Sequence, residues 1–239
     1  MRDKSILYFS DIYRSENLRE ILSGNVREVD FGDVGGTCCY CDAESAAEIR
    51  KGVAGVPVSD IHFIDTGDYH YVSLFFCERI EEPFDLLLFD RHPDIQRPKF
   101  EGVLSCGSWV WELIEHHPFL GKVHMVGVAP ELRTEAASYP EKVRFFDTPE
   151  DLPEIIGNLY VSIDKDALGR EVSLTDWDQG GMSLEMLEKF LAKAASKANV
   201  LGADICGGLA ASKGGTDHSA RINLESDLKV ASLLDDCIR

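Results

Sequence analysis

The chain has 239 residues, 44% of them hydrophobic, so it is long enough to bury one large core. It carries 42 acidic against 24 basic residues, and this net charge of -18 opposes binding to nucleic acid or to anionic membranes. Its longest apolar runs are too short to span a bilayer, and its amino terminus is too polar for a signal peptide. Seven cysteines, an odd number without a secretory signal, favour reduced thiols and a cytoplasmic location.

Short apolar runs alternate with helical patterns along the whole chain. The runs predict strands at residues 5–10, 26–31, 61–65, 85–90, 122–128, 143–146, 159–164 and 200–205. Helical spacing predicts helices near residues 15–22, 43–51, 69–78, 103–117, 130–137, 183–198 and 220–234. Strands that are apolar on both faces belong in a mainly parallel sheet. We therefore predict a three-layer α/β/α sandwich with about eight strands, formed by residues 1–239 as a single domain because no Pro/Gly/Ser-rich stretch divides them.

Residues of the metal-ligand type end two of the predicted strands. Asp90, His92 and Asp94 alternate after the apolar run 84–89, and Asp164 and Asp166 alternate after the run 159–163. Side chains at alternate positions of an extended segment point to the same side, so each set presents its carboxylates together. Four carboxylates directed at one place repel each other unless cations lie between them. The sequence therefore predicts a metal site, with two ions.

A third segment places a histidine at the same edge of the predicted sheet. Residues 66–70 read Thr-Gly-Asp-Tyr-His and follow the strand predicted at 61–65, so His70 lies near the other two sets. With Asp-Arg-His-Pro-Asp at 90–94 and Ser-Ile-Asp-Lys-Asp at 162–166, the chain resembles the arginase/agmatinase/formiminoglutamase (ureohydrolase) family, as a divergent member. The family signatures are Gly-Gly-Asp-His, Asp-x-His-x-Asp and Ser-x-Asp-x-Asp, in this order. Gly-Gly-Met-Ser at 180–183 matches the family's Gly-Gly-Leu-Thr, and the resemblance extends from about 61 to 208.

The resemblance implies a ligand set for two divalent ions, with manganese preferred and iron, cobalt or zinc as alternatives. His70 and Asp94 would bind the first ion, and His92 and Asp166 the second. Asp90 and Asp164 would bridge the pair, because a carboxylate has two oxygens to share. Two ions can lower the pKa of a bridging water, so that hydroxide attacks a trigonal carbon.

Three departures from the family pattern concern the turn before His70, the proton shuttle and the recognition of substrate. Tyr69 is inserted where the family has Asp-His, so His70 requires a different turn. Ser105 or Cys106 occupies the place of the family's proton-shuttle histidine, and residues 202–208 lack the glutamate that pairs with a guanidinium group. A buried cation needs a carboxylate partner, so arginine and agmatine are poor candidates as substrates. We expect Asp94, Asp164, Ser105 and Cys106 to act in catalysis, and Trp177 and Cys206 to contact substrate.

These inferences predict a hydrolase that cleaves a non-peptide C–N bond in a small linear amidine-like or guanidine-like substrate. Two alternatives remain: a zinc-type deacetylase on the same fold, which would hold one ion, or a catalytically silent metal-binding or regulatory protein. The expected partner is a small molecule, and the chain could also form a homo-oligomer. Cys38, Cys39 and Cys41 could bind zinc, but no second ligand pair with clear spacing is present, so burial or pocket lining is the preferred interpretation.

Overall fold

A computed structural model describes residues 2–237, whose centre is an eight-stranded sheet. The strand order is β2-β1-β4-β10-β9-β5-β7-β8, and all its pairings are parallel. The strands are β1 (Lys4–Tyr8), β2 (Val26–Asp30), β4 (Ile61–Ile64), β5 (Phe84–Phe89), β7 (Leu120–Val126), β8 (Val143–Phe146), β9 (Gly157–Asp164) and β10 (Ala198–Cys206). Each predicted strand is present near its predicted bounds, so the predicted parallel sheet is confirmed.

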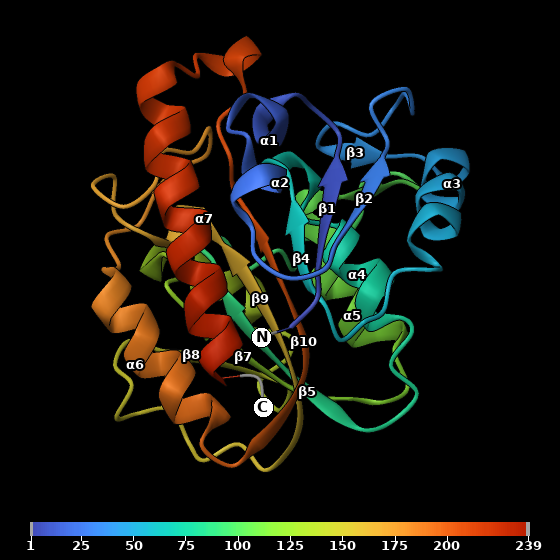
Figure 1. Ribbon diagram of the computed structural model, residues 1–239. Coiled ribbons are helices and arrows are strands. Elements are labelled where there is room, and N and C mark those ends of the chain that lie inside the picture. The colour runs from blue at the N-terminus through green and yellow to red at the C-terminus, as the bar shows by residue number, and fades with distance from the viewer. Residues whose placement is uncertain (1, 238–239) are drawn as a thin grey trace.

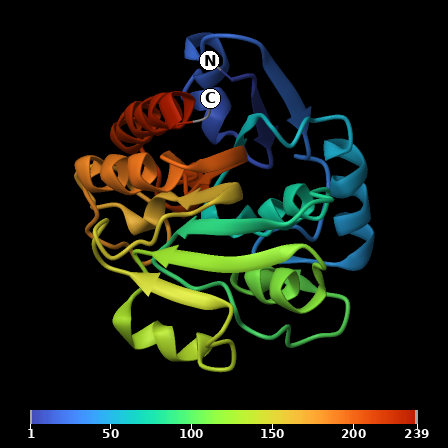
Figure 2. The ribbon, with the colours of Figure 1, turned by 90° about the horizontal axis from the view of Figure 1, so that it is seen from below.

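Helices cover both faces of this sheet (Figures 1 and 2). One face packs against α1 (Ile12–Ser15), α2 (Leu18–Ile21), α6 (Leu184–Ala195) and α7 (Asp217–Cys237). The other face packs against α3 (Ala43–Val53), α4 (Val72–Cys77) and α5 (Trp109–His116). Each face has its own cluster of buried apolar side chains, which confirms the predicted three-layer α/β/α sandwich.

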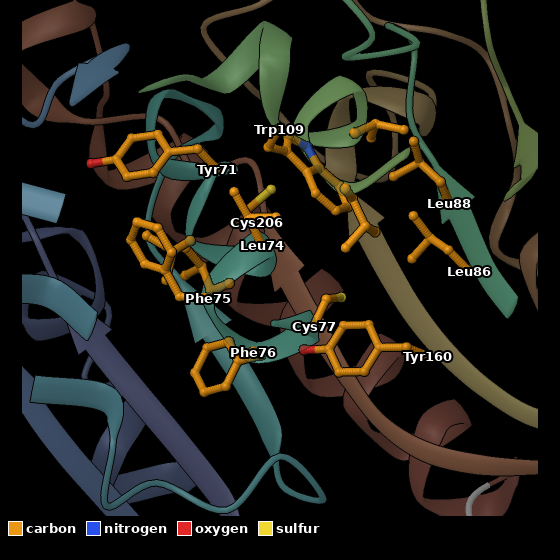
Figure 3. Packing of buried hydrophobic residues seen from close by; sticks show 14 of the residues in the cluster. Tyr71, Leu74, Phe75, Phe76, Cys77, Leu86, Leu88, Trp109, Tyr160 and Cys206 are labelled. Atoms are coloured by element: carbon orange, nitrogen blue, oxygen red, sulfur yellow. The ribbon is translucent and has the colours of Figure 1, made fainter. Parts of the chain in front are cut away.

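Local sequence explains how these helices dock on the sheet. The Ser183 hydroxyl accepts the backbone N–H of Met186 and so caps α6, which buries Leu187 and Phe190 on the side facing the sheet. On the opposite face, the aromatic residues of α4 pack beside the apolar strand β5 and Tyr160 of β9 (Figure 3). Within residues 2–237, no helix combines the length and the apolar character needed to cross a membrane.

Three predicted helices differ from the structure. Residues 103–108 form the short strand β6 (Leu104–Ser105) and the 3-10 turn η2 (Cys106–Ser108), and only then does α5 begin. β6 pairs antiparallel with β3 (Tyr40–Cys41), and this pairing satisfies backbone hydrogen-bonding groups that precede the helix. Residues 130–137 form the 3-10 helix η3 (Pro130–Ala136). The predicted helix at 15–22 is divided into α1 and α2, because Asn17 adopts a left-handed φ of 54°.

The strand order brings the predicted metal-ligand segments together. β4, β10, β9 and β5 are neighbours in the middle of the sheet, and parallel strands end at the same edge. Phe89 at the end of β5 pairs with Ile163 of β9, so the next residues, Asp90 and Asp164, lie side by side. Cys206 pairs with Asp164 from the other side. The site therefore lies at the carboxyl edge of the central strands.

Candidate metal centre

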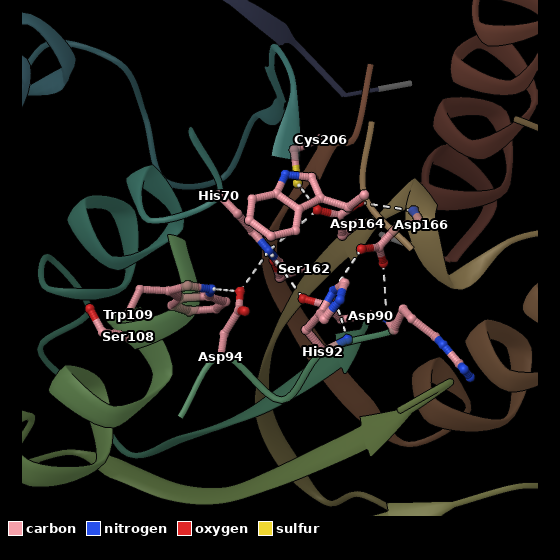
Figure 4. Close-up of polar contacts among 12 residues, drawn as sticks. His70, Asp90, His92, Asp94, Ser108, Trp109, Ser162, Asp164, Asp166 and Cys206 are labelled. Carbon is pink, nitrogen blue, oxygen red and sulfur yellow. Dashed lines mark hydrogen bonds and ion pairs between the residues drawn. The ribbon is translucent and has the colours of Figure 1, made fainter. Parts of the chain in front are cut away.

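All six predicted ligands converge at this edge (Figure 4). His70 follows β4 through the 3-10 turn η1 (Gly67–Tyr69), and the segment from Asp90 to Asp94 follows β5. Asp164 ends β9, and Asp166 lies in the short turn η4 (Lys165–Ala167). The structure thus brings together residues that are up to 96 positions apart in the sequence, from His70 to Asp166.

The first cluster surrounds the imidazole of His70. Its Nδ1 atom lies 3.2 Å from Oδ2 of Asp90 and 3.1 Å from Oδ2 of Asp94. Oδ2 of Asp164 is 3.7 Å from the same nitrogen. Three carboxylate oxygens therefore lie within 3.7 Å of one imidazole nitrogen.

The second cluster surrounds His92. Its Nδ1 atom lies 2.9 Å from Oδ2 of Asp166 and 3.5 Å from Oδ1 of Asp90. Asp90 therefore directs one oxygen to His70 and the other to His92. This division of oxygens is what a carboxylate shared by two cations requires.

A chain of hydrogen bonds behind His70 fixes the orientation of its ring. The Ser162 hydroxyl donates to Oδ1 of Asp204 at 2.6 Å, and it lies 2.9 Å from Nε2 of His70. Because that hydroxyl has one hydrogen, it accepts from the Nε2–H of His70. A neutral His70 then keeps its lone pair on Nδ1, directed at the carboxylates. The sequence analysis missed this role, although Ser162 alternates with Asp164 in the same motif.

Asp94 is held at the start of α5. Its backbone has a left-handed φ of 49°, and its carbonyl oxygen accepts the N–H of Val110 at 3.0 Å. The indole N–H of Trp109 donates to Oδ2 of Asp94 at 2.8 Å. Trp109 is fully buried, so this oxygen is fixed in position by a rigid side chain.

The turn before His70 accommodates the inserted tyrosine. The ring of Tyr69 stacks on Phe9 with a centroid distance of 4.3 Å, away from the two clusters. Gly67 passes so close to β9 that a Cβ atom there would lie 2.9 Å from Oδ2 of Asp164. The same atom would lie 3.0 Å from Cδ1 of Trp177. Glycine at this position therefore permits the close approach of the turn.

Burial and mutual repulsion shift the pKa values of these groups. Burial, then Asp166 and Asp90, raises the pKa of Asp164 to about 8. Burial, then Asp90, raises the pKa of Asp166 to about 7. Burial opposes charge on His92, but hydrogen bonds with Asp166 and Asp90 outweigh it and raise the pKa of His92 to about 11. Without other cations, protons must neutralise this site, which is the electrostatic condition under which divalent cations bind well.

A cavity of about 210 Å³ opens onto the two clusters. All six ligand candidates line this cavity. Five further residues of its wall are Cys39, Tyr40, Gly67, Gln96 and Gly107. Ser105, Cys106 and Trp177 also line it, and their proposed roles in catalysis and substrate contact stay predictions. Cys206 does not belong to the described lining. It is fully buried behind Asp164, and its thiol donates to Oδ2 of that residue at 3.2 Å.

A polar network that the sequence analysis missed borders the cavity around Asp68. Asp68 accepts the indole N–H of Trp177 at 3.2 Å and the Lys213 ammonium at 2.5 Å. Lys213 also pairs with Asp176 at 2.7 Å. Asp68 belongs to the first motif, but Lys213 lies 145 residues further along the chain, and no motif connects them.

Similarity to known structures agrees with this geometry. An arginase from Medicago truncatula superposes with a TM-score of 0.67 and 16% identity, covering 99% of this chain and 87% of that one. A formimidoylglutamase from Bacillus subtilis gives 0.66 and 12%, covering 98% and 88%. The chain has an arginase-like fold. An arginase from Entamoeba histolytica in complex with L-ornithine shares this arginase-like fold, with a TM-score of 0.64 and 14% identity, covering 98% of this chain and 99% of that one.

Comparisons at the level of sequence extend less far. No family model matches the chain. An uncharacterized protein of Thermotoga maritima is 32% identical over 149 residues, which are 62% of this chain. The match spans 57% of the length of that protein. The identities to the solved structures are low, so the arginase-like fold rests on the structure, whereas activity has to be argued from the site.

Proposed function

We propose that this chain is a two-metal hydrolase that cleaves a non-peptide C–N bond in a small linear amidine-like or guanidine-like substrate. The observation that carries the proposal is the shared carboxylate of Asp90, with one oxygen near His70 and the other near His92. A site for a single ion needs only one of these clusters. Similarity to arginase and formimidoylglutamase structures supports the same reaction class.

The donor set fits two divalent ions. Asp90, Asp94, Asp164 and Asp166 carry four negative charges when ionised, which two divalent cations neutralise. Oxygen-rich sites with two imidazoles suit manganese. Ions bound there would supply the means to lower the pKa of a water molecule and to stabilise charge on the attacked carbon.

The residues of the chain then have separate roles. Ser162 holds the Nε2–H of His70, so that Nδ1 stays available as a ligand atom. Trp109 fixes Asp94, and the Cys206 thiol donates to Asp164. These contacts keep the ligand atoms in place before any ion arrives, which lowers the cost of binding.

The cavity restricts the substrate to a small molecule. At about 210 Å³ it is smaller than typical drug-sized pockets of roughly 300–1,000 Å³. Its acidic lining residues are the four aspartates of the two clusters. Apart from His70 and His92, the remaining described lining carries no ionic side chain and has Gln96, Tyr40 and Ser105 as polar groups. We therefore propose that the remote end of the substrate is bound through neutral hydrogen bonds rather than through an additional carboxylate.

Metal stoichiometry tests this proposal against the zinc-type deacetylase. We expect about two ions per chain after manganese loading, measured by elemental analysis on the desalted protein. One tightly held ion would favour the deacetylase, because that enzyme needs a single metal. Fewer than one ion per chain would exclude both.

Turnover is measured separately. Formimino compounds, guanidines and acylated polyamines are incubated with the manganese-loaded protein, and release of ammonia, urea or amine is recorded. We expect release from at least one small C–N substrate and its loss in Asp164→Ala. Two bound ions without turnover on any substrate would favour a silent metal-binding protein. Activity that survives in Asp164→Ala would refute the proposed role of this residue.

A further inference from the structure

Two cysteines face each other at the wall of the cavity. Tyr40 pairs with Ser105 and Cys41 with Leu104 in the antiparallel ribbon of β3 and β6, so the next facing positions are Cys39 and Cys106. The N–H of Cys106 donates to the carbonyl oxygen of Cys39 at 3.0 Å. This backbone hydrogen bond holds the two Cα atoms within about 7 Å of each other, which is close to the range of roughly 4.4–6.8 Å that a disulfide spans.

The side chains of this pair also meet and can be reached. The Cys106 and Cys39 side chains lie close enough to influence each other's pKa, and both residues line the cavity. Each is partly accessible, whereas Cys41, Cys77 and Cys206 are buried. A small oxidant that enters the cavity therefore meets Cys39 and Cys106 together.

The two thiols differ in reactivity. The hydrogen bond from Cys106 is the main cause that lowers the pKa of Cys39, although burial and Asp68 oppose it. Burial, then Asp68, raises the pKa of the neighbouring Cys38 to about 12, so Cys38 stays a thiol. Since the thiolate is the nucleophile, Cys39 is the more reactive member of the group.

We propose that Cys39 and Cys106 form a redox-active thiol pair that closes to a disulfide when the protein meets hydrogen peroxide. The sulfur of Cys39 attacks the peroxide O–O bond, which gives a sulfenic acid on Cys39 and releases one water. The sulfur of Cys106 then displaces the sulfenic oxygen as a second water, and the S–S bond forms. Two thiols are oxidised and one peroxide is reduced to two waters, so atoms and electrons balance.

The position of the pair connects its oxidation to the cavity. The Cys39 thiol donates to Oδ1 of Asp68 at 3.0 Å, and the indole of Trp177 donates to the same oxygen. A disulfide removes the S–H donor and joins the two strands of the ribbon covalently across the cavity wall. The pair is thus a modification site beside the metal centre, and its existence does not depend on the proposed hydrolysis.

Peptide mapping tests the pairing on the wild-type protein. The reduced, metal-free protein is treated with hydrogen peroxide in the presence of a chelator and digested with trypsin under non-reducing conditions. We expect a cross-link between the tryptic peptides 28–50 and 100–122, loss of two of the seven thiols, and an intact-mass decrease of about 2 Da that a dithiol reverses. A cross-link within 28–50 alone, or thiol loss without any cross-link, would overturn the proposal.

Two serine variants define the order of the steps. In Cys106→Ser the sulfenic acid has no partner, so dimedone should label Cys39 and the cross-link should be absent. Cys38→Ser is the matched control, and it should still form the cross-link. Loss of the cross-link in Cys38→Ser, in a protein with unchanged far-UV circular dichroism, would contradict the pairing. Thiols of freshly purified protein that react only after a chelator is added would instead assign Cys38, Cys39 and Asp68 to metal binding.

Discussion

Replacing Asp90 by asparagine should affect both proposed ions, whereas replacing Asp94 or Asp166 should affect one each. Asp90 directs its two oxygens to different imidazoles, at 3.2 Å from His70 and 3.5 Å from His92. Of the two imidazoles, Asp94 contacts that of His70, and Asp166 contacts that of His92. We therefore expect no tightly bound manganese ion per chain in the Asp90 variant and one in each of the Asp94 and Asp166 variants. The wild type should bind two.

The size of the effect follows from the burial of the site. Asp90 is 1% exposed, and removing one member of a buried charge pair costs about 3–5 kcal/mol. At 1.4 kcal/mol per factor of ten, the affinity should fall by roughly a hundredfold to a few thousandfold. At fixed free manganese, even a hundredfold loss removes about 2.7 kcal/mol of ligand stabilisation. For a chain of this length, that corresponds to a melting temperature lower by roughly 5–10 °C.

The metal-free protein should respond in the opposite direction. Asp90 is one of the charges that raise the pKa of Asp164, so its carboxylate repels Asp164 when no cation is present. Neighbouring like charges at an effective dielectric constant of about 20 repel by a few kcal/mol, on the order of 3 kcal/mol, and partial protonation reduces this. We expect Asp90→Asn to stabilise the metal-free protein by about 1–2 kcal/mol at pH 8. Without manganese, Asp90→Asn should therefore be more stable than the wild type. With manganese, it should be less stable than the wild type.

Differential scanning fluorimetry with and without manganese, combined with elemental analysis, measures both effects. Asp178→Asn is the control, because Asp178 is exposed and lies outside the two clusters. It should keep two ions and the manganese-dependent rise in melting temperature. If Asp90→Asn retained one ion at wild-type affinity, Asp90 would not be shared, and the two-metal arrangement would be refuted.

Three further predictions concern the frame around the site. Burial lowers the pKa of His62 to about 3, so the contribution of neutral His62 to the free energy of unfolding is fully present above pH 6.5. Below pH 6.5 the free energy of unfolding should fall by about 1.4 kcal/mol per pH unit. Urea unfolding should show this slope in the wild type and not in His62→Gln. Asp227→Ala leaves the fully buried Lys165 ammonium without its partner at 2.6 Å and should cost about 3–5 kcal/mol of unfolding free energy, and a Lys165→Met/Asp227→Leu double variant should cost less. Gly67→Ala should weaken manganese binding in titration calorimetry, because its Cβ would lie 2.9 Å from a ligand oxygen, whereas Gly55→Ala has open space and should not.

The metal-ligand candidates could be predicted from sequence because two simple geometric rules place them. Alternating residues of a strand point to one side, and parallel strands end at one edge. Asp90 and Asp164 each follow an apolar strand directly, so the register of β5 and β9 brings them side by side. His70 could be placed only through its resemblance to a motif, since the turn that carries it depends on packing of Tyr69 against Phe9.

The cavity wall could not be predicted in the same way. Its ribbon is made of two-residue strands, β3 and β6, which are too short to show an alternating pattern. The segment 103–108 is predicted as the first part of a helix, whereas its residues Leu104 and Ser105 pair with Cys41 and Tyr40. The contact between Asp68 and Lys213 depends on the whole fold, because these residues lie 145 positions apart in the sequence. Short pairings and long-range ion pairs leave no local signal.

The backbone beside the metal-ligand candidates also limits which residues can contact the substrate. The segment after β10, where the family that the sequence resembles has a glutamate, has Gly207 with a left-handed φ of 94°. A Cβ atom there would lie 2.5 Å from Oδ1 of Asp164 and 2.8 Å from the backbone nitrogen of Lys165. Any side chain at position 207 would therefore displace a ligand candidate. We therefore propose that the substrate is recognised by the neutral polar part of the cavity lining, which includes Gln96.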